Sequence, residues 1–204
     1  MNATELKTIT MGEFIYGKGY MGLFTEGFGN GDVVGVRNSG YIVEFEIKVT
    51  AQDLRNEIKS IQGALCGDMR LSYSRSKFYK HEKYLGKDTS KYGYVDTSYR
   101  PNLFYFVVPI ELEKIAVEGV KGTPYGVLCQ GKWTWTYHFT GFHRNGETEE
   151  RPGYGFKESA KATLIHKEKI TNEQMKRLVR KATTELYETR RRFGVSLTPT
   201  HIQG

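Results

Sequence analysis

The chain has 204 residues, of which 38% are hydrophobic and 13% are aromatic. This length supports one substantial core and is short for two, so we expect a single domain over residues 1–204. The formal net charge of +7 suits a polyanionic partner. The longest uncharged, mostly apolar run, residues 103–110, is far shorter than the roughly 20 residues that cross a bilayer, which argues against a membrane partner. Two cysteines in no dense pattern, and a start without the plan of a signal peptide, favour a reducing cytoplasm.

The first part of the chain is expected to form a helix and then a sheet with tight turns. A short helix is expected to start at Thr4, and Gly12, Gly17, Gly19 and Gly22 are expected to break the helical periodicity soon after. Strands are expected over residues 20–24 and 32–37. Asn38-Ser39-Gly40 then predicts a three-residue hairpin loop, since a glycine in the last position adopts the left-handed conformation without steric cost.

Residues 41–49 alternate apolar and charged side chains so strictly that they predict a half-buried strand. Glu44, Glu46 and Lys48 would lie on its charged face. A surface strand with a solvated outer face is the simplest interpretation. The alternative is a metal site, because Asp32 together with Glu46 and Lys48 would supply the two acids and the ammonium group that phosphodiester cleavage requires.

The hairpin loop decides whether that site can form. If residues 38–40 are the loop, Arg37 pairs with Tyr41, and Asp32 lies directly opposite Glu46. Opposed residues of an antiparallel pair hold their Cβ atoms roughly 4.5 to 5.5 Å apart. Two carboxylates at that separation repel each other unless a cation or a proton lies between them. A two-residue loop would shift the register by one residue and remove the pairing.

The rest of the chain is expected to add helices, a central strand, an aromatic hairpin and a basic terminal helix. Capping patterns at Thr50 with Asp53 and at Thr171 with Gln174 predict two helix starts. The other expected elements are helices over 74–85 and 110–120, a buried strand over 103–108, and strands over 124–130 and 133–139. The core stripe expected for the terminal helix is Met175, Leu178, Val179, Ala182, Leu186 and Tyr187.

The order helix, three strands, helix, strand, helix, with Asp32 followed by Glu46-Ile47-Lys48 on the next strand, resembles the core of the PD-(D/E)xK nuclease superfamily. The stretches that look like its MmcB-like DNA-repair branch and phage relatives are residues 29–34, 43–53 and 101–109. The resemblance covers residues 20–130, approximately, and leaves residues 131–204 as an elaboration. It implies an α/β (α+β) fold of the restriction-endonuclease-like type, a mixed β-sheet flanked by helices, with an added aromatic β-hairpin and a basic C-terminal helix.

The resemblance also implies a divalent cation, Mg²⁺ or Mn²⁺, held by Asp32, Glu46 and the backbone carbonyl of Ile47. Lys48 would orient water or stabilise the charge that develops on the phosphate, and Glu26 lies where many members keep an additional acid. Oxygen ligands of this kind suit magnesium, which prefers octahedral oxygen coordination and retains waters. Nearby carboxylates should keep the lysine protonated in the resting site.

Positive charge gathers in the last quarter of the chain. Residues 157–192 contain eleven Lys or Arg against five Glu, a surplus of six. Such a helix can neutralise phosphates, the main source of sequence-independent affinity for nucleic acid, although charge on a helix is more commonly its solvated face. His81 also has the helical spacing of a packed residue. The residues expected to contact nucleic acid are Lys77, Lys80, His81, Lys176, Arg177, Arg180 and Lys181.

Three functional hypotheses follow. The first is a metal-dependent nuclease that acts on DNA in repair, recombination or phage DNA metabolism, in the host cytoplasm if a phage encodes it. The second is a protein of the same fold that binds nucleic acid without cutting, and the third is an interaction or structural protein. DNA or RNA, endo- or exonucleolytic cutting, and a monomer or a homodimer all remain open. Gly31 departs from the pattern of the MmcB-like branch, in which a basic residue is common at that position. Trp133 and Trp135 suit either stacking on unpaired bases or packing in the core or in a dimer.

Overall fold

A computed structural model describes residues 1–15, 20–26, 31–87, 100–138 and 148–192. Its strands are β1 (Tyr20–Glu26), β2 (Val33–Arg37), β3 (Ile42–Ile47), β4 (Leu103–Pro109), β5 (Gly126–His138) and β6 (Thr148–Ala160). They form one sheet in chain order. Neighbours are antiparallel except at β3–β4 and β4–β5, which are parallel. The sheet is therefore mixed, as expected.

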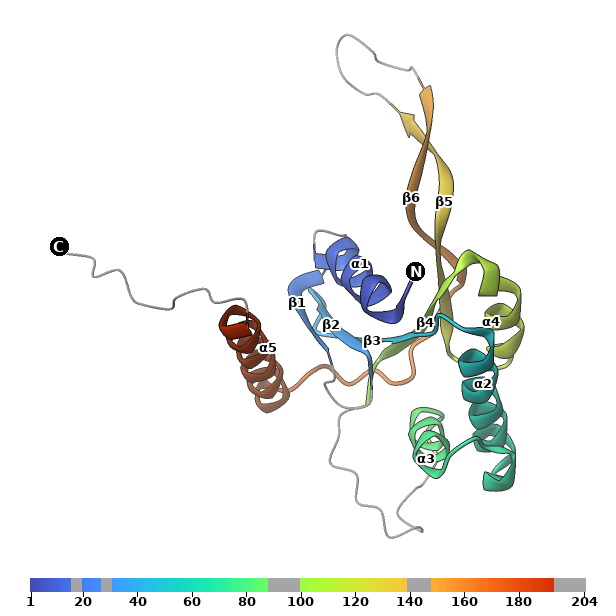
Figure 1. Cartoon of the computed structure of the whole chain (residues 1–204). Helices are drawn as coiled ribbons and strands as arrows, with labels where there is room; N and C mark the ends of the chain where they lie inside the picture. Colours follow the sequence, from blue (N-terminus) through green and yellow to red (C-terminus); the bar gives the residue numbers. More distant parts are fainter. Residues whose placement is uncertain (16–19, 27–30, 88–99, 139–147, 193–204) are drawn as a thin grey trace, which may run out of the picture.

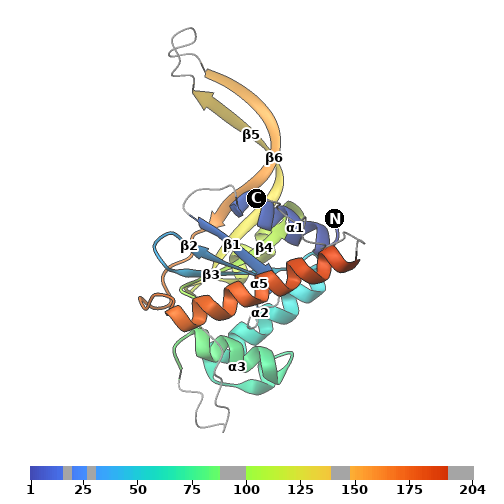
Figure 2. The same ribbon diagram turned by 90° about the vertical axis from the view of Figure 1, so that its left-hand side faces the viewer.

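Helices cover both faces of this sheet (Figures 1 and 2). They are α1 (Ala3–Ile15), α2 (Ala51–Cys66), α3 (Arg75–Tyr84), α4 (Glu113–Gly119) and α5 (Asn172–Arg192), with short 3-10 turns at Met69–Leu71 and Ile110–Leu112. The expected α/β class is confirmed, and the expected order helix, three strands, helix, strand, helix is found with one more helix, α3, between α2 and β4. Across the described segments, we find no helix with the length and apolar character needed to cross a membrane.

The core is divided by the sheet into two layers. On one face, Leu6 of α1 packs with Val43, Phe45 and Ile47 of β3. On the other face, Leu54 and Ile61 of α2 pack with the apolar side chains of β4 and of α4. The terminal helix α5 lies on this second face, where its buried Leu178 contacts Val34, Val36 and Ile42. Charged residues of β3 therefore face α2 and α3, between these apolar clusters.

The expected capping patterns are confirmed. The Thr50 hydroxyl accepts a hydrogen bond from the Asp53 N–H at 3.2 Å, which satisfies one of the unpaired donors at the start of α2. Thr171 and Gln174 bond reciprocally, with N–H to side-chain oxygen distances of 2.8 and 3.2 Å, at the start of α5. Both helices thus begin where the sequence predicts.

Three expectations about the elements are wrong. Helix α1 continues past Gly12 to Ile15, because packing of its apolar residues on the sheet outweighs the roughly 1 kcal/mol that a glycine costs in a helix. The expected strands 124–130 and 133–139 are one strand, β5. The second strand of the expected hairpin is β6, whose position was not predicted and which pairs with β5 from Val127 to His138. The paired β5 and β6 extend away from the rest of the sheet (Figure 1). In α5, Val179 and Tyr187 are 46% and 52% exposed instead of lying in the core.

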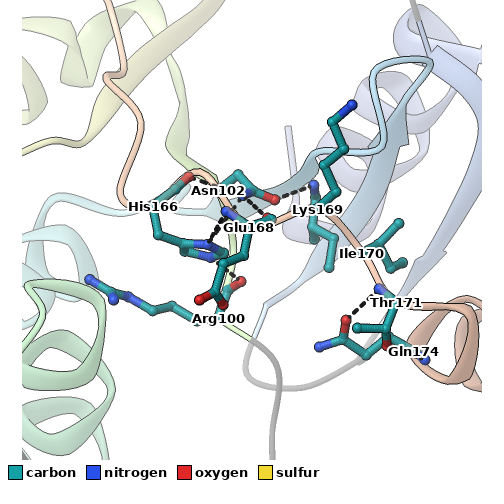
Figure 3. Close-up of a pocket in the computed structure, with 9 residues that line it drawn as sticks. Arg100, Asn102, His166, Glu168, Lys169, Ile170, Thr171 and Gln174 are labelled. Carbon is teal, nitrogen blue, oxygen red and sulfur yellow. Dashed lines mark hydrogen bonds between the residues drawn. The ribbon is translucent and has the colours of Figure 1, made fainter.

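A polar clamp joins the start of β4 to the segment before α5, beside a cavity of about 290 Å³ (Figure 3). The buried Asn102 accepts a hydrogen bond from the Ile42 N–H at 2.8 Å. Its amide group donates to the carbonyls of His166 and Glu168 at 3.1 and 2.6 Å. Because the His166 Nδ1 accepts the Glu168 N–H, its Nε2 must donate to the Arg100 carbonyl, at 2.8 Å.

The clamp holds α5 against the sheet, because it fixes the segment that leads into that helix. The Ile170 N–H continues it by donating to the Gly40 carbonyl at 2.9 Å. The amide oxygen and nitrogen of Asn102 both form hydrogen bonds with backbone groups. The polar residues beside this cavity therefore have a structural role, and no ligand is needed to explain them.

Replacement of Asn102 by Ala should lower the free energy of unfolding by about 3 kcal/mol, because it leaves a buried N–H and two carbonyls without their partner. Urea denaturation measures the change. The matched control is Asn172→Ala, at an exposed position in the first turn of α5, which should change stability by less than about 0.5 kcal/mol. Equal effects of the two substitutions would contradict the role of the clamp.

Candidate active site

The hairpin loop between β2 and β3 has the predicted form. Gly40 is in the left-handed conformation, with φ of 83°, and the Arg37 N–H donates to the Tyr41 carbonyl at 2.9 Å. The pairing of β2 with β3 then runs without a register shift back to Val33, the first residue of β2. The next residue down, Asp32, therefore lies opposite Glu46, as the three-residue loop requires.

Asp32 lies just before β2, where the ladder ends. Its carboxylate accepts a hydrogen bond from the Ile47 N–H at 2.9 Å and pairs with the Lys7 ammonium of α1 at 3.0 Å. The N–H and the carbonyl of a residue point to the same side of an antiparallel strand, because opposed residues exchange both bonds. The Ile47 carbonyl therefore faces the strand edge at which Asp32 lies.

The charged face of β3 is buried, which corrects the prediction of a half-buried strand. Glu44, Glu46 and Lys48 are 0%, 2% and 4% exposed, respectively. The reason is that α2 and α3 cover this face, so the strand has no solvated side. A surface strand with a charged outer face is thus the wrong interpretation of the alternation.

Glu46 is held by three lysines. Its Oε1 accepts from Lys48 at 2.9 Å and from Lys77 at 2.8 Å, and its Oε2 accepts from Lys80 at 2.7 Å. Burial opposes the charged form of this carboxyl, but the three ammonium groups outweigh it and hold the pKa of Glu46 well below its usual value. Glu46 is therefore a buried carboxylate at neutral pH.

Glu57 of α2 is a further member of the cluster. Its carboxylate contacts the ammonium groups of Lys48 and Lys77 at 3.3 and 2.9 Å, and His81 Nε2 at 2.9 Å. Burial opposes its ionisation, yet the His81 hydrogen bond and the nearby cations lower the pKa of Glu57 to about 2. One sequence signal could have found it, because position 57 falls on the apolar face of α2 defined by Leu54 and Ile61.

His81 connects Glu57 to the core. A carboxylate can only accept, so His81 donates from Nε2 to Glu57, and its Nδ1 then accepts from the Tyr125 hydroxyl at 3.1 Å. Burial lowers the pKa of His81, although Glu57 opposes the shift, so the ring is neutral at pH 7. The ring is fully buried and cannot reach a nucleic acid in this structure, which corrects its expected role as a phosphate contact.

Lys80 is likewise buried, so its expected contact with nucleic acid is also corrected. Its ammonium pairs with Glu44 at 2.9 Å as well as with Glu46, and lies 5.1 Å from the ring centre of Phe104. The Tyr84 hydroxyl donates to the other oxygen of Glu44 at 2.6 Å. Lys80 therefore compensates charge inside the protein.

Glu44 also explains why position 31 is a glycine. A Cβ atom at position 31 would lie 2.4 Å from the Glu44 Cγ, closer than real Cβ contacts. Gly31 thus permits the close approach that buries Glu44, and the positive charge beside this acid comes from Lys80 instead of from position 31.

Lys48 is a permanent cation in this environment. Burial opposes its charged form, but Glu46 and Glu57 outweigh that effect and raise the pKa of Lys48 above its usual value. Its ammonium also contacts Asp53 at 3.3 Å. Lys48 can therefore donate hydrogen bonds but cannot act as a general base, in agreement with the expected protonated lysine.

Asp32 and Glu46 lie opposite each other in the β2–β3 hairpin, but their carboxylates share no partner among the described residues. Asp32 pairs with Lys7 of α1. Glu46 pairs with Lys48, which follows β3, and with two lysines of α3. Among the described residues, no hydrogen bond or ion pair links the two acids. No group of three or more His, Cys, Asp or Glu among the described residues is arranged to hold a metal. A cation at this place would have to displace an ammonium group.

The other expected site residues lie elsewhere. The Glu26 backbone pairs with Val33, but its side chain lies outside the described atoms, as do those of Trp133 and Trp135. The side chain of Lys77 is one-third exposed, at the edge of the cluster. The four basic residues expected on α5 are all exposed, and they are Lys176, Arg177, Arg180 and Lys181.

Replacement of Glu57 by Gln should cost about 3 kcal/mol of stability at pH 7, because two ammonium groups lose a shared carboxylate. Since the pKa of Glu57 is lower in the folded protein, at about 2, than the usual 4.5, its stabilisation is complete above pH 4.5 and is lost as the pH falls towards 2. The difference between wild type and variant in urea denaturation should therefore shrink over that range. Glu111→Gln, at an exposed position, is the control. A difference that does not change with pH would contradict the assignment.

Comparison with known proteins adds little to this picture. No protein-family model matches the chain, and no curated protein matches it. A solved structure of a protein of unknown function from Silicibacter pomeroyi is 15% identical, with a TM-score of 0.32, over 78% of this chain and 66% of that protein. The chain thus spans slightly less than two thirds of that relative. A likeness at this level defines neither fold nor function.

Proposed function

We propose that the protein is a cytoplasmic metal-dependent nuclease that hydrolyses phosphodiester bonds in DNA, in repair, recombination or phage DNA metabolism. The observation that carries this proposal is the register of the β2–β3 hairpin. It brings Asp32 opposite Glu46 and onto the N–H of Ile47, the residue between Glu46 and Lys48. Asp32 and the Glu46-Ile47-Lys48 motif are thus neighbours in the sheet. The sheet order and its covering helices support the same proposal.

The donor set fits a hard divalent cation by its chemistry. Asp32, Glu46 and the Ile47 carbonyl would hold Mg²⁺ or Mn²⁺, since all three offer oxygen and magnesium keeps several of its own waters. When bound, such an ion neutralises phosphate charge and acidifies a water. Lysine ammonium groups contact oxygens of both carboxylates, which supports the proposal that a cation can bind at these positions.

The chain's own residues supply the remaining functions. Lys48 stays protonated, so it donates a hydrogen bond to a phosphate oxygen and stabilises charge as it develops. Glu57 and Glu46 hold this ammonium in place. On α5, Lys176 and Arg180 have no carboxylate partner among the described residues, whereas Arg177 and Lys181 pair with Glu173 and Glu185. The first two are thus the better candidates for contacts with the DNA backbone.

A nucleic-acid-binding protein that does not cut is the second candidate. The observation in its favour is the engagement of both Glu46 oxygens by lysines, which leaves the site without an open ligand position. This candidate shares the basic face of α5 but predicts no cleavage. A purely structural or interaction role, the third candidate, predicts neither binding nor cleavage.

Cleavage should be tested over duplex, nicked, branched and single-stranded DNA, and over RNA, with and without Mg²⁺. Glu46→Gln and Lys48→Ala should each abolish cutting while binding persists. Both residues are buried, so thermal unfolding must show that each variant is folded, and Asp32→Asn, at a more exposed acid, is a third test. Glu118→Gln and Lys114→Ala, exposed on α4, are the matched controls. Salt-sensitive binding without cutting on any substrate would refute the nuclease and favour the second candidate.

The double substitution Lys176→Ala with Arg180→Ala should weaken DNA binding to a similar extent for all sequences, because backbone contacts carry no sequence information. Each lost phosphate contact lowers the slope of log K against log salt by about 0.9, so the slope should fall by roughly 2. Fluorescence anisotropy at several salt concentrations measures both quantities. Lys114→Ala with Lys121→Ala, on and just after α4, should leave them unchanged. An unchanged slope in the α5 variant would place the DNA elsewhere.

A further inference from the structure

The turn between α2 and α3, residues 67–74, exposes large apolar side chains. Met69, Leu71 and Tyr73 are 37%, 51% and 68% exposed. A single exposed apolar side chain is ordinary on a protein surface, but three in one short turn are typical of a binding surface. Tyr73 is the most exposed large hydrophobic side chain among the described residues. Packing of the core therefore does not account for this ring.

Hydrogen bonds to α2 hold this turn in place. The N–H of Tyr73 donates to the Ser60 hydroxyl at 3.3 Å, and the Ser72 hydroxyl lies 2.9 Å from the same oxygen. The turn approaches α2 closely because Gly63 has no side chain, and a Cβ atom there would lie 2.9 Å from the Asp68 carbonyl oxygen. Tyr73 is thus presented on a fixed backbone, which reduces the entropy that binding through its ring would cost.

The turn lies beside the candidate active site. Ser74, the residue after Tyr73, caps α3 by accepting a hydrogen bond from the N–H of Lys77 at 3.3 Å. The Lys77 ammonium contacts Glu46 and Glu57 at 2.8 and 2.9 Å, and its side chain is one-third exposed. A strand that passes the exposed edge of the cluster at Lys77 would therefore be within reach of the Tyr73 ring.

The sequence around Tyr73 carries positive charge. Residues 69–77 contain three basic side chains and no acidic one. Arg70 pairs with Asp68 at 3.0 Å, whereas Arg75 is exposed and has no hydrogen bond or ion pair with another described residue. Basic side chains attract phosphate, and an aromatic ring fits the face of a nucleobase. This combination favours a nucleic-acid strand over an apolar protein surface as the partner of the turn.

We propose that Tyr73 stacks on an unpaired base of a DNA strand whose phosphates contact Arg75. The inference rests on the proposed nuclease function and names its substrate class, which is single-stranded DNA or a duplex that contains an unpaired stretch. Bases within an intact duplex stack on one another and leave no free face for the ring. The contact is independent of sequence, because every base has an aromatic face.

The test is fluorescence anisotropy with labelled single-stranded DNA and with the duplex of the same sequence, in the presence of a chelator so that no metal-dependent cleavage occurs. Tyr73→Ala should bind the single strand about tenfold more weakly than wild type, the loss expected for one stacked base, and should bind the duplex equally well. Tyr73→Phe, which keeps the ring, should bind both like wild type. Leu71→Ala, at an exposed apolar position of the same turn, is the matched control and should change neither affinity.

Equal binding of the single strand by wild type and Tyr73→Ala would overturn the stacking contact. The contact would also be overturned if Tyr73→Ala and Leu71→Ala both reduced self-association in analytical ultracentrifugation without a change in DNA affinity, because the turn would then join two copies of the chain. Cleavage that persists in a Tyr73→Ala variant with unchanged binding would leave the nuclease proposal intact. A tenfold loss in Tyr73→Ala, with no cutting by wild type, would support stacking on a protein that only binds. No DNA binding by wild type would overturn both proposals.

Discussion

Burial of a charged strand face is the constraint on which the rest of the structure depends. Glu44 and Glu46 lie beneath α2 and α3, where an unpaired carboxylate would cost several kcal/mol. Three lysine ammonium groups neutralise these carboxylates, and two of them, Lys77 and Lys80, belong to α3. The position of α3 is therefore set by charge compensation as well as by the apolar packing of Phe78 and its neighbours.

That arrangement is a poor way to stabilise a fold. Attraction within a buried ion pair is largely offset by desolvation, and apolar residues of similar volume stabilise a core as well or better. The site adds a second cost, because Gly31 must lack a side chain to make room for Glu44. Stability alone therefore does not explain these buried charges, and this is the physical reason why the proposed chemistry is placed at Glu46 and Lys48.

Local signals in the sequence predicted local structure well. The loop at residues 38–40 follows from a glycine in its last position, and the starts of α2 and α5 follow from their capping residues. Burial of β3 could not be predicted in this way, because alternation of charged and apolar residues is typical of a strand with one solvated face. The charged face is buried in part by α3, whose Lys80 is typical of a surface residue until its partners on β3 are known.

The two acids of the candidate site thus depend on interactions of different range. Asp32 is placed by a three-residue turn and by the Ile47 N–H, both close in the chain. The state of Glu46 is decided by α3, more than 30 residues away along the chain, through Lys77 and Lys80. The local backbone therefore sets the environment of the first acid, whereas a distant helix sets most of the environment of the second. The charge compensation of Glu46 therefore depends on the helix that covers the strand, and the hairpin alone does not determine it.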